Sequence, residues 1–299
     1  MRIQGLGTRA VLIQDLDPDE TDVLHLGVAH FRHARAPLPP HIHKGAIEFV
    51  YVETGTIHFC VEKETFQLNG GQVFVSFPDE IHGTGQLPFE RSSYGWIALS
   101  LDGPDDRFMG LSLPAALQAR ERLRNLDRRV FDGSSTLMTM IKRAVESCLH
   151  PNEFSPLILH SSVMEFITHL LEDYDHGKQE VLSPEILMAK EYIKNNLTSH
   201  FTLDEVANTC GLSLPTLKRR FKKETGVPPY EHIMRQKVLY AAELLKNSTA
   251  DITDIAYDLG FSSSQHFATA FKKWMYQSPR DYRSNKPVTP RNLIQPGNK

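Results

Sequence analysis

A pattern that occurs twice near the C-terminus of this 299-residue chain leaves few folds open. Each copy has a short apolar segment, then a glycine, then a second segment with regularly spaced apolar residues that ends in two lysines. A proline follows a few residues later. The first copy runs from Leu203 to Pro229 and the second from Ile252 to Pro279. The apolar spacing indicates a helix on each side of the glycine, which tolerates the positive φ of a tight turn. The repeat therefore predicts two helix–turn–helix units in tandem.

The second helix of such a unit lies in the major groove of DNA. Leu217 and Phe221 in the first unit, and Phe267 and Phe271 in the second, are spaced i and i+4 and are expected to face the protein core. The residues predicted to contact DNA lie on the opposite helix faces. They are Pro215, Thr216, Lys218, Arg219, Lys222, Lys223, Ser264, Gln265, Ala268, Thr269, Lys272 and Lys273.

The two predicted faces differ in charge. Lys218 and Arg219 suit hydrogen bonds to guanine, and Gln265 suits adenine. The paired lysines further along each helix suit phosphates. We therefore expect the first unit to dominate affinity and the second to contribute selectivity.

Charge is distributed unevenly along the chain. Residues 183–299 hold 17 Lys and Arg against 11 Asp and Glu, a net charge of +6, whereas residues 1–182 hold 16 against 25, a net charge of −9. A basic part joined to an acidic part keeps a DNA-binding field local. A single helix–turn–helix pattern is often only a helical corner, but two copies in register with a basic balance argue against that interpretation.

The N-terminal part, from about residue 10 to 101, has the pattern of short strands. Alternating segments at 47–52, 56–61, 65–68, 72–77 and 94–101 are separated by glycine and by Asn69-Gly70-Gly71. Many short strands with such turns predict a small barrel or jelly roll. Helical periods follow from about 113, with start signals at Ser134 or Ser135 and at Ser155-Pro156. The fold class is thus α+β and multidomain.

These patterns divide the chain into segments. We expect a β-rich sensing domain at 1–112, a helical segment at 113–176, a linker at 177–183, the DNA-binding domain at 184–284 and a disordered tail at 285–299. The helix after Ser155 carries an apolar stripe wider than a lone surface helix needs. It packs onto the β-rich domain or forms the seam of a homodimer. The stripe comprises Leu157, Ile158, Val163, Met164, Ile167, Leu170 and Leu171.

A set of metal-ligating side chains lies in the β-rich part. His41 and His43, at i and i+2, are expected to share one face of a strand, with Glu48 and His82 on neighbouring strands. Three imidazoles and one carboxylate suit a divalent transition metal: Zn, Mn, Fe, Ni or Cu. In the alternative, the same four side chains hydrogen-bond a polyol directly. Purely structural histidines are the third interpretation.

Aromatic residues on the expected strands are candidates for effector contact. Tyr51, Phe74 and Trp96 can stack on a sugar ring if they face inward, although aromatics on strands are more often core residues. Other histidines of the region show no comparable pattern and are expected to be ordinary surface or packed residues. These are His25, His30, His33 and His58.

The C-terminal repeat resembles the AraC/XylS family of bacterial transcriptional regulators over about residues 184–284. The residues that carry the resemblance are Gln236-Lys237-Val238, Ala241-Ala242-Glu243-Leu244-Leu245, Ile252-Thr253-Asp254-Ile255-Ala256, Gly260-Phe261-Ser262, Phe267, Phe271-Lys272-Lys273 and Ser278-Pro279-Arg280-Asp281-Tyr282-Arg283. Tyr276 departs from the family's usual glycine. The resemblance implies two units joined by a long helix, binding to promoter DNA, activation through RNA polymerase and control by a small molecule.

The spacing from His41 to Gly55, with Pro78 and His82 downstream, resembles the two cupin motifs, although the second motif lacks its middle glycine. Regulators of the AraC type commonly carry a cupin-like sensor, and the two resemblances support each other. The resemblance implies a small-molecule effector, with a carbohydrate as the first expectation. A cupin metalloenzyme fused to a DNA-binding domain is the alternative function. An architectural DNA-binding protein fits the long acidic N-terminal part poorly.

The three cysteines, Cys60, Cys148 and Cys210, form no C-x-x-C pair, and a disulfide framework is not expected. The N-terminus lacks the apolar run of a signal peptide, and no segment approaches the roughly 20 apolar residues that span a bilayer. We therefore expect a cytoplasmic protein.

Overall fold

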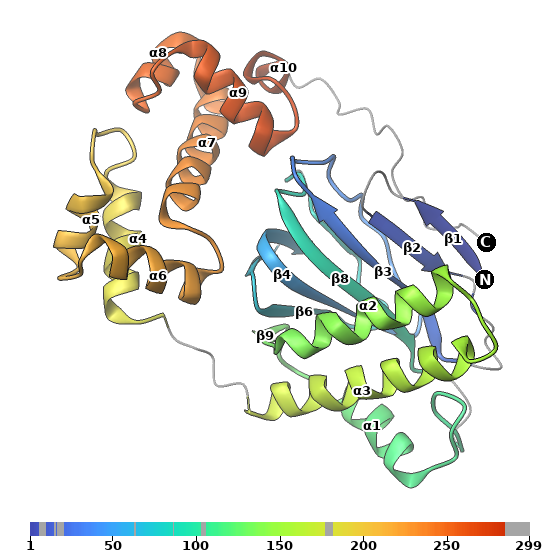
Figure 1. Ribbon diagram of the computed structural model, residues 1–299. Helices are drawn as coiled ribbons and strands as arrows, with labels where there is room; N and C mark the ends of the chain where they lie inside the picture. Colours follow the sequence, from blue (N-terminus) through green and yellow to red (C-terminus); the bar gives the residue numbers. More distant parts are fainter. Residues whose placement is uncertain are drawn as a thin grey trace.

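The computed structural model describes residues 1–5, 10–14, 16, 21–62, 64–85, 87–102, 106–176 and 182–284. A β-rich N-terminal half, covered by helices, precedes an all-helical C-terminal half (Figure 1). The N-terminal elements are β1 (Arg2–Gly5), β2 (Ala10–Gln14), β3 (Val23–Phe31), β4 (Ala46–Val61), β5 (Glu64–Asn69), β6 (Gln72–Ser76), β7 (His82–Gly83), β8 (Ser92–Ser100), α1 (Pro114–Arg124), β9 (Val130–Asp132), α2 (Ser135–Leu149) and α3 (Ser155–His176). The C-terminal helices are α4 (Pro184–Asn195), α5 (Leu203–Thr209), α6 (Leu214–Thr225), α7 (Pro229–Asn247), α8 (Ile252–Asp258), α9 (Ser264–Met275) and α10 (Pro279–Arg283).

The described strands form one antiparallel sheet in the order β1-β2-β3-β8-β4-β6-β9, with β5 and β7 paired to the second half of β4. The sequence predicts two strands separated at Gly55, but β4 continues through this residue. Gly55 has φ +89°, and a Cβ there would lie 2.3 Å from the carbonyl oxygen of Arg91. Gly55 therefore bends the strand instead of ending it. Before the bend β4 pairs with β6 and β8, and after it with β5 and β7.

Helices α2 and α3 cover one face of the sheet (Figure 1). Phe49 of β4 meets Phe166 of α3 with ring centroids 6.1 Å apart, and both side chains are fully buried. Most of the apolar stripe on α3 packs against the sheet, since Val163, Ile167 and Leu170 belong to the same core. Each such burial stabilises the fold by about 1.5–3 kcal/mol. The packing interpretation of the stripe therefore holds for its central and C-terminal part.

The segment between α1 and α2 contains a strand that the sequence does not predict. Val73 of β6 pairs with Phe131 of β9, and Phe131 lies in the core between the sheet and the helices. Residues 113–176 are therefore part of the N-terminal half and share its core. The first residues of the expected linker, 177–181, lie outside the described residues, as does the expected tail at 285–299.

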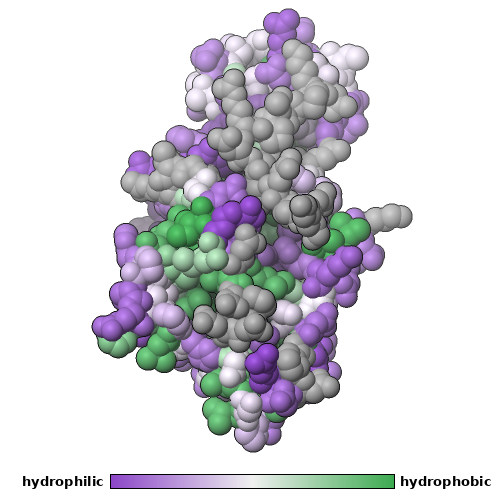
Figure 2. Space-filling model, turned by 90° about the vertical axis from the view of Figure 1, so that its right-hand side faces the viewer, coloured by the Kyte–Doolittle hydropathy of each residue, from purple (hydrophilic) through white to green (hydrophobic). Residues whose placement is uncertain are grey.

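Two separate cores hold the C-terminal half. The first lies among α4, α5 and α6, around Ile193, Val206 and Phe221. The second lies among α7, α8 and α9. Thr202 and Glu205 form a reciprocal capping box that starts α5. Within the described ranges, no helix combines the length and apolar character needed to cross a bilayer. Figure 2 shows a largely hydrophilic upper, C-terminal part and more apolar surface over the N-terminal part.

Candidate functional site

The first recognition helix, α6, presents the expected basic face. Leu217 and Phe221 are fully buried and anchor the helix to its core. Of the residues predicted to contact DNA, Thr216 is half-buried and all others on α6 are exposed. The exposed ones are Pro215, Lys218, Arg219, Lys222 and Lys223. Ser213 precedes the helix in an extended conformation, and its hydroxyl donates to Thr216 Oγ1 at 2.9 Å.

Arg220 does not share the function of its neighbour Arg219. Its guanidinium bonds both carboxylate oxygens of Glu185 at 3.2 Å and Glu224 at 3.3 Å. Glu224 also accepts from the hydroxyl of Ser183 at 2.6 Å. This network ties α6 to the start of α4. Arg219 is thereby left as the exposed arginine on the DNA-facing side of the helix.

The second recognition helix, α9, repeats this geometry with fewer charges. Phe267 and Phe271 are fully buried. Ser263 caps the helix by accepting from the backbone N–H of His266 at 3.0 Å. Among the predicted contact residues Ala268 is half-buried and the rest are exposed. The exposed ones are Ser264, Gln265, Thr269, Lys272 and Lys273. His266, which is also exposed in the first turn, was not among the predicted contacts.

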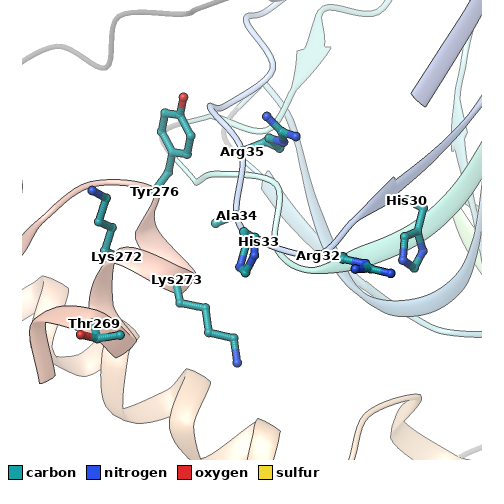
Figure 3. Close-up of a pocket in the computed structure, with 9 residues that line it drawn as sticks. All are labelled: His30, Arg32, His33, Ala34, Arg35, Thr269, Lys272, Lys273 and Tyr276. Carbon is teal, nitrogen blue, oxygen red and sulfur yellow. The ribbon is translucent and has the colours of Figure 1, made fainter. Parts of the chain in front are cut away.

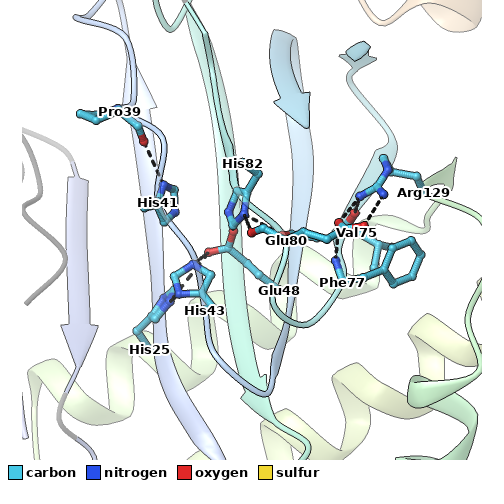
Figure 4. Close-up of polar contacts among 11 residues, drawn as sticks. His25, Pro39, His41, His43, Glu48, Val75, Phe77, Glu80, His82 and Arg129 are labelled. Carbon is cyan, nitrogen blue, oxygen red and sulfur yellow. Dashed lines mark hydrogen bonds and ion pairs between the residues drawn. The ribbon is translucent and has the colours of Figure 1, made fainter. Parts of the chain in front are cut away.

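The four predicted metal ligands come together in the N-terminal half (Figure 4). One ligand atom from each of His41, His43, Glu48 and His82 lies within 4.8 Å of the others. Glu48 lies on β4 and His82 on β7, while His41 and His43 lie in the segment that precedes β4. The backbones of His41 and His82 are joined by two hydrogen bonds of 2.9 and 3.0 Å. The prediction that His41 and His43 lie on a regular strand is wrong. His41 forms only an isolated β-bridge with His82.

The side chains of this His–Glu cluster are oriented by hydrogen bonds. His82 Nε2 lies 3.1 Å from Glu48 Oε2, and His82 Nδ1 lies 2.8 Å from Ser76 Oγ. The His41 ring is oriented by the carbonyl oxygen of Pro39, 3.0 Å from its Nδ1. Partners of this kind on the second ring nitrogen fix the tautomer of a ligating histidine.

A further histidine joins the cluster, contrary to the expectation that it is an ordinary residue. His25 of β3 places Nε2 3.4 Å from His43 Nδ1 and 3.9 Å from Glu48 Oε1. His25 Nδ1 is buried without a hydrogen-bond partner among the described residues, and His43 Nε2 is buried 3.6 Å from Glu48 Oε1, too far for a hydrogen bond. Buried polar atoms are normally paired. Unpaired imidazole nitrogens beside a carboxylate are the atoms that a metal ion or a polar ligand can bind.

Burial and mutual contacts shift the pKa values of the cluster. Burial alone would raise the pKa of Glu48, but the close contacts of His43 and His82 with its carboxylate outweigh burial and hold that pKa well below its usual value. Burial lowers the pKa of His25 to about 4, with Glu48 opposing the shift. For His82, burial lowers the pKa, but its hydrogen bond to Glu48 produces a net rise. The cluster thus combines an ionised carboxylate with a neutral His25 ring.

The chain matches two domain families and several known regulators. Residues 206–285 match a helix-turn-helix domain and residues 31–87 a cupin domain. The HTH-type transcriptional activator RhaS from one Escherichia coli strain is 40% identical over 95 residues, which are 32% of this chain and 34% of that protein. RhaS from another strain is 27% identical over 260 residues, 84% of this chain and 90% of that protein.

Two solved structures are also similar to parts of the chain. The C-terminal domain of AraT, a response regulator from Geobacillus stearothermophilus, is 30% identical and covers 39% of this chain and 98% of that one, with a TM-score of 0.35. ToxT from Vibrio cholerae is 15% identical and covers 87% and 97%, with a TM-score of 0.34. Both scores are low, and the family assignment rests on the sequence matches.

The domain matches and the RhaS relatives support an AraC-type regulator with a cupin-like N-terminal domain. Tyr276, the departure from the family pattern, occupies the left-handed end of α9 with φ +64°, where the equivalent residue of α6 is Gly226 with φ +73°. The turn is therefore retained despite the side chain. The RhaS relatives are named as transcriptional activators.

The three aromatic candidates in the cupin-like domain do not share one face. Phe74 and Trp96 pair with Val50 across neighbouring strands and lie in the inner core of the cupin. Tyr51 belongs to the core beneath α2 and α3, so it does not meet the condition of facing inward. Successive residues of a strand alternate in direction. Glu48 faces the inner side, hence Val50 does too and Tyr51 does not.

The two halves of this regulator meet at a buried arginine that the sequence did not single out. Arg235 of α7 is 3% exposed and bonds Glu90 Oε1 through Nε at 2.6 Å. It also contacts the ring of His58 and, at 3.4 Å, Gln67 of β5. His58 is therefore an interdomain residue and not an ordinary one. Burial and the Arg235 charge lower its pKa to about 3.

Proposed function

We propose that the chain is a promoter-binding transcriptional activator whose cupin domain binds a small molecule. The observation that carries the proposal is the pair of exposed recognition helices, α6 and α9, each anchored by two buried apolar residues and joined by α7. A helix with exposed Lys and Arg on one face can donate to guanine edges and phosphates in the major groove. The RhaS relatives are transcriptional activators by name. Activation through contact with RNA polymerase is part of the proposal.

The effector would act through the contact between the two halves. A ligand that binds one arrangement of the cupin better shifts the population of arrangements, and so changes how α6 and α9 meet DNA. Strand β4 carries Glu48 of the His–Glu cluster before its bend and His58, the contact of Arg235, after it. Thus one strand connects the candidate ligand site to the helix that joins both units.

DNA binding can be tested with the full chain and a duplex selected from a random pool. The double variant Lys218→Ala/Arg219→Ala should bind at least roughly tenfold more weakly in fluorescence anisotropy, because one good base contact provides about 1–3 kcal/mol. Arg122→Ala/Arg143→Ala, which removes two exposed arginines from α1 and α2, is the charge-matched control. Equal affinity of the two variants would count against the proposal.

We further propose that the His–Glu cluster binds a divalent transition metal. The donor set fits the group: three imidazoles and a carboxylate converge, His43 Nε2 is buried 3.6 Å from Glu48 Oε1 without a hydrogen bond, and Ser76 orients His82. A metal bound here would act as a Lewis acid toward oxygen atoms of the effector. A carbohydrate, whose hydroxyl groups can bind a metal or these side chains directly, is the proposed effector class.

The metal content of untagged protein decides whether the His–Glu cluster binds a metal or contacts the effector directly. Inductively coupled plasma mass spectrometry should find near-stoichiometric metal in the wild type and a loss in His41→Ala/His43→Ala. His150→Ala/His169→Ala removes two histidines from α2 and α3 and should keep the metal. Metal-free wild type would leave direct effector contact by the four residues, to be tested with a sugar panel.

We also propose a homodimer formed through the start of α3. Leu157 is 67% exposed and Phe154, just before the helix, is 58% exposed, so this end of the stripe is not used by the core. Two copies would place four helix–turn–helix units on one promoter. Sedimentation should report a dimer for the wild type and a monomer for Leu157→Glu. A wild-type monomer bound to DNA would exclude this part of the proposal.

A further inference from the structure

A cleft separates the second recognition helix from the cupin domain (Figure 3). It measures about 880 Å³. One wall is the C-terminal part of α9, with Thr269, Lys272 and Lys273, and the other is the segment that follows β3. The cleft therefore lies beside residues that are expected to contact DNA.

The cleft is positively charged on both walls. Lys272 and Lys273 come from α9, and Arg32 and Arg35 come from the cupin. All four side chains are exposed, and no carboxylate lines the cleft among the described residues. Like charges gathered without counter-ions repel one another. The arrangement gains stability when an anion enters.

Several arginines elsewhere in the described chain are paired with acids. Arg129 pairs with Glu80 at 2.7 Å, and Arg220 with Glu185 at 3.2 Å. Within the described residues, neither Arg32 nor Arg35 has an ion pair; Arg35 instead lies 5.5 Å from the centroid of the Phe31 ring. These two guanidinium groups are therefore available to an outside partner.

The two walls are held in register by a direct bond. The backbone N–H of Ala34 donates to the carbonyl oxygen of Lys273 at 3.1 Å. Arg35 follows Ala34 directly and Arg32 lies two residues before it, so this bond places the backbone of both arginines near α9. A helix placed in the major groove brings its C-terminal lysines to the flanking phosphates. The cupin arginines lie next to that place.

We propose that the cupin domain contributes to DNA binding directly, with Arg32 and Arg35 contacting phosphates of the duplex read by α9. The inference rests on the proposed DNA-binding function and extends the binding surface beyond the helix–turn–helix units. Arginine is suited to this task because its planar group bonds phosphate oxygens in pairs. The exposure of all four cations favours an extended backbone over a small buried anion.

The salt dependence of binding tests this inference. Each phosphate contact adds about 0.9 to the slope of log K against log salt. With the full chain and a fluorescein-labelled selected duplex, Arg32→Ala/Arg35→Ala should lower the magnitude of the slope by about 2 and weaken binding roughly tenfold at 0.1 M salt. Arg32→Lys/Arg35→Lys, which keeps the charge, should retain most of the slope.

Controls separate the inference from the function on which it rests. Arg122→Ala/Arg143→Ala removes the same charge from a distant face and should leave the slope unchanged. An unchanged slope in Arg32→Ala/Arg35→Ala, with normal binding by the wild type, overturns the inference alone. Failure of the wild type to bind duplex overturns both.

A second arm uses inorganic pyrophosphate at constant ionic strength. We expect it to raise the melting temperature of wild type and Arg32→Ala/Arg35→Ala equally. Stabilisation that is lost in the variant while its DNA slope stays normal would make the cleft a small-anion site, and the DNA inference would be wrong.

Discussion

The two helix–turn–helix units have the same architecture and different surroundings. Helix α6 ends at Gly226, where a Cβ would lie 2.4 Å from the backbone nitrogen of Gly70, so backbone meets backbone there. Helix α9 ends at Tyr276, beside an open cleft. The first helix carries four exposed cations of its own, whereas α9 carries two and faces two more on the cupin.

This difference indicates that the units depend on the sensor in different ways. The charge of α6 belongs to the DNA-binding half alone. The electrostatic field around α9 is shared with Arg32 and Arg35, so it changes if the cupin moves. Of the two units, the second is therefore the one whose affinity an effector can alter most directly.

The largest expected effect comes from the contact that holds both units to the cupin. Arg235→Ala should cost about 3–5 kcal/mol, because it leaves the buried Glu90 without its partner. Urea unfolding of the full chain measures this loss. Arg91→Ala is the control: Arg91 is exposed and its pair with Glu231 is 3.7 Å long, worth about 0–1 kcal/mol. Similar losses for both variants would show that the Arg235 contact is not maintained in solution.

As the pH falls, the first helix–turn–helix unit should lose folding stability before the second. Phe221 packs on His232 with ring centroids 5.3 Å apart, and Phe271 packs on Tyr282 at 5.4 Å. Burial, followed by the charges of Lys190 and Arg235, lowers the pKa of His232 to about 4. The unfolded chain takes up the proton first, so stability falls as pH drops from about 6.5 toward 4, by roughly 2–3 kcal/mol.

The variants His232→Tyr and His232→Gln isolate this effect, since other buried histidines titrate in both wild type and variants. The difference in stability between pH 7 and pH 4.5 should be smaller in the variants, as measured by urea unfolding. An identical acid loss in wild type and both variants would assign the sensitivity elsewhere.

The recognition helices should differ in their share of the affinity. Arg219→Ala should cost about 1–3 kcal/mol of operator binding, and Thr269→Ala less than about 1, because only the first removes a charged donor. Thr269 also directs its hydroxyl to the carbonyl oxygen of Gln265 at 2.9 Å within the helix. Anisotropy titrations with a selected duplex measure both. Equal losses of binding free energy in the two variants, or a larger loss in Thr269→Ala, would contradict the expected dominance of the first unit.

The smallest effect concerns the two helix ends. Tyr276→Gly should stabilise the second unit by about 1 kcal/mol, because a left-handed conformation costs other residues about 1–2 kcal/mol. Gly226→Ala should have the opposite sign, since it adds both strain and a clash with Gly70. Thermal unfolding of the two variants provides the comparison. A stabilised Gly226→Ala would contradict the close approach of the two backbones.

The tandem units were predictable because their signals are local. Glycine turns and i, i+4 apolar pairs such as Leu217 and Phe221 determine the helices within about 25 residues. The His41–His43–Glu48 spacing likewise places ligands near one another. His25 was missed because it reaches the cluster only through the pairing of β3 with β8 and of β8 with β4.

Other features could not be predicted from local patterns. Arg235 looks like any polar residue of a long helix until the cupin covers it, and its partner Glu90 is 145 positions away. Arg32 and Arg35 meet α9 only through the packing of the halves. The orientation of Tyr51 was predictable: alternation from Glu48 assigns it to the outer face.

The near-complete burial of Arg235, Glu90 and His58 has a consequence for how a single molecule would respond to an effector. These exposed fractions are 3%, 5% and 6%, and partial separation of the halves would strand their polar groups away from both water and each other. Intermediate openings would therefore be rarely populated, and an effector that separates the halves would act by shifting the protein between two discrete arrangements. Graded amounts of effector then change the time spent in each arrangement, and individual molecules respond in steps.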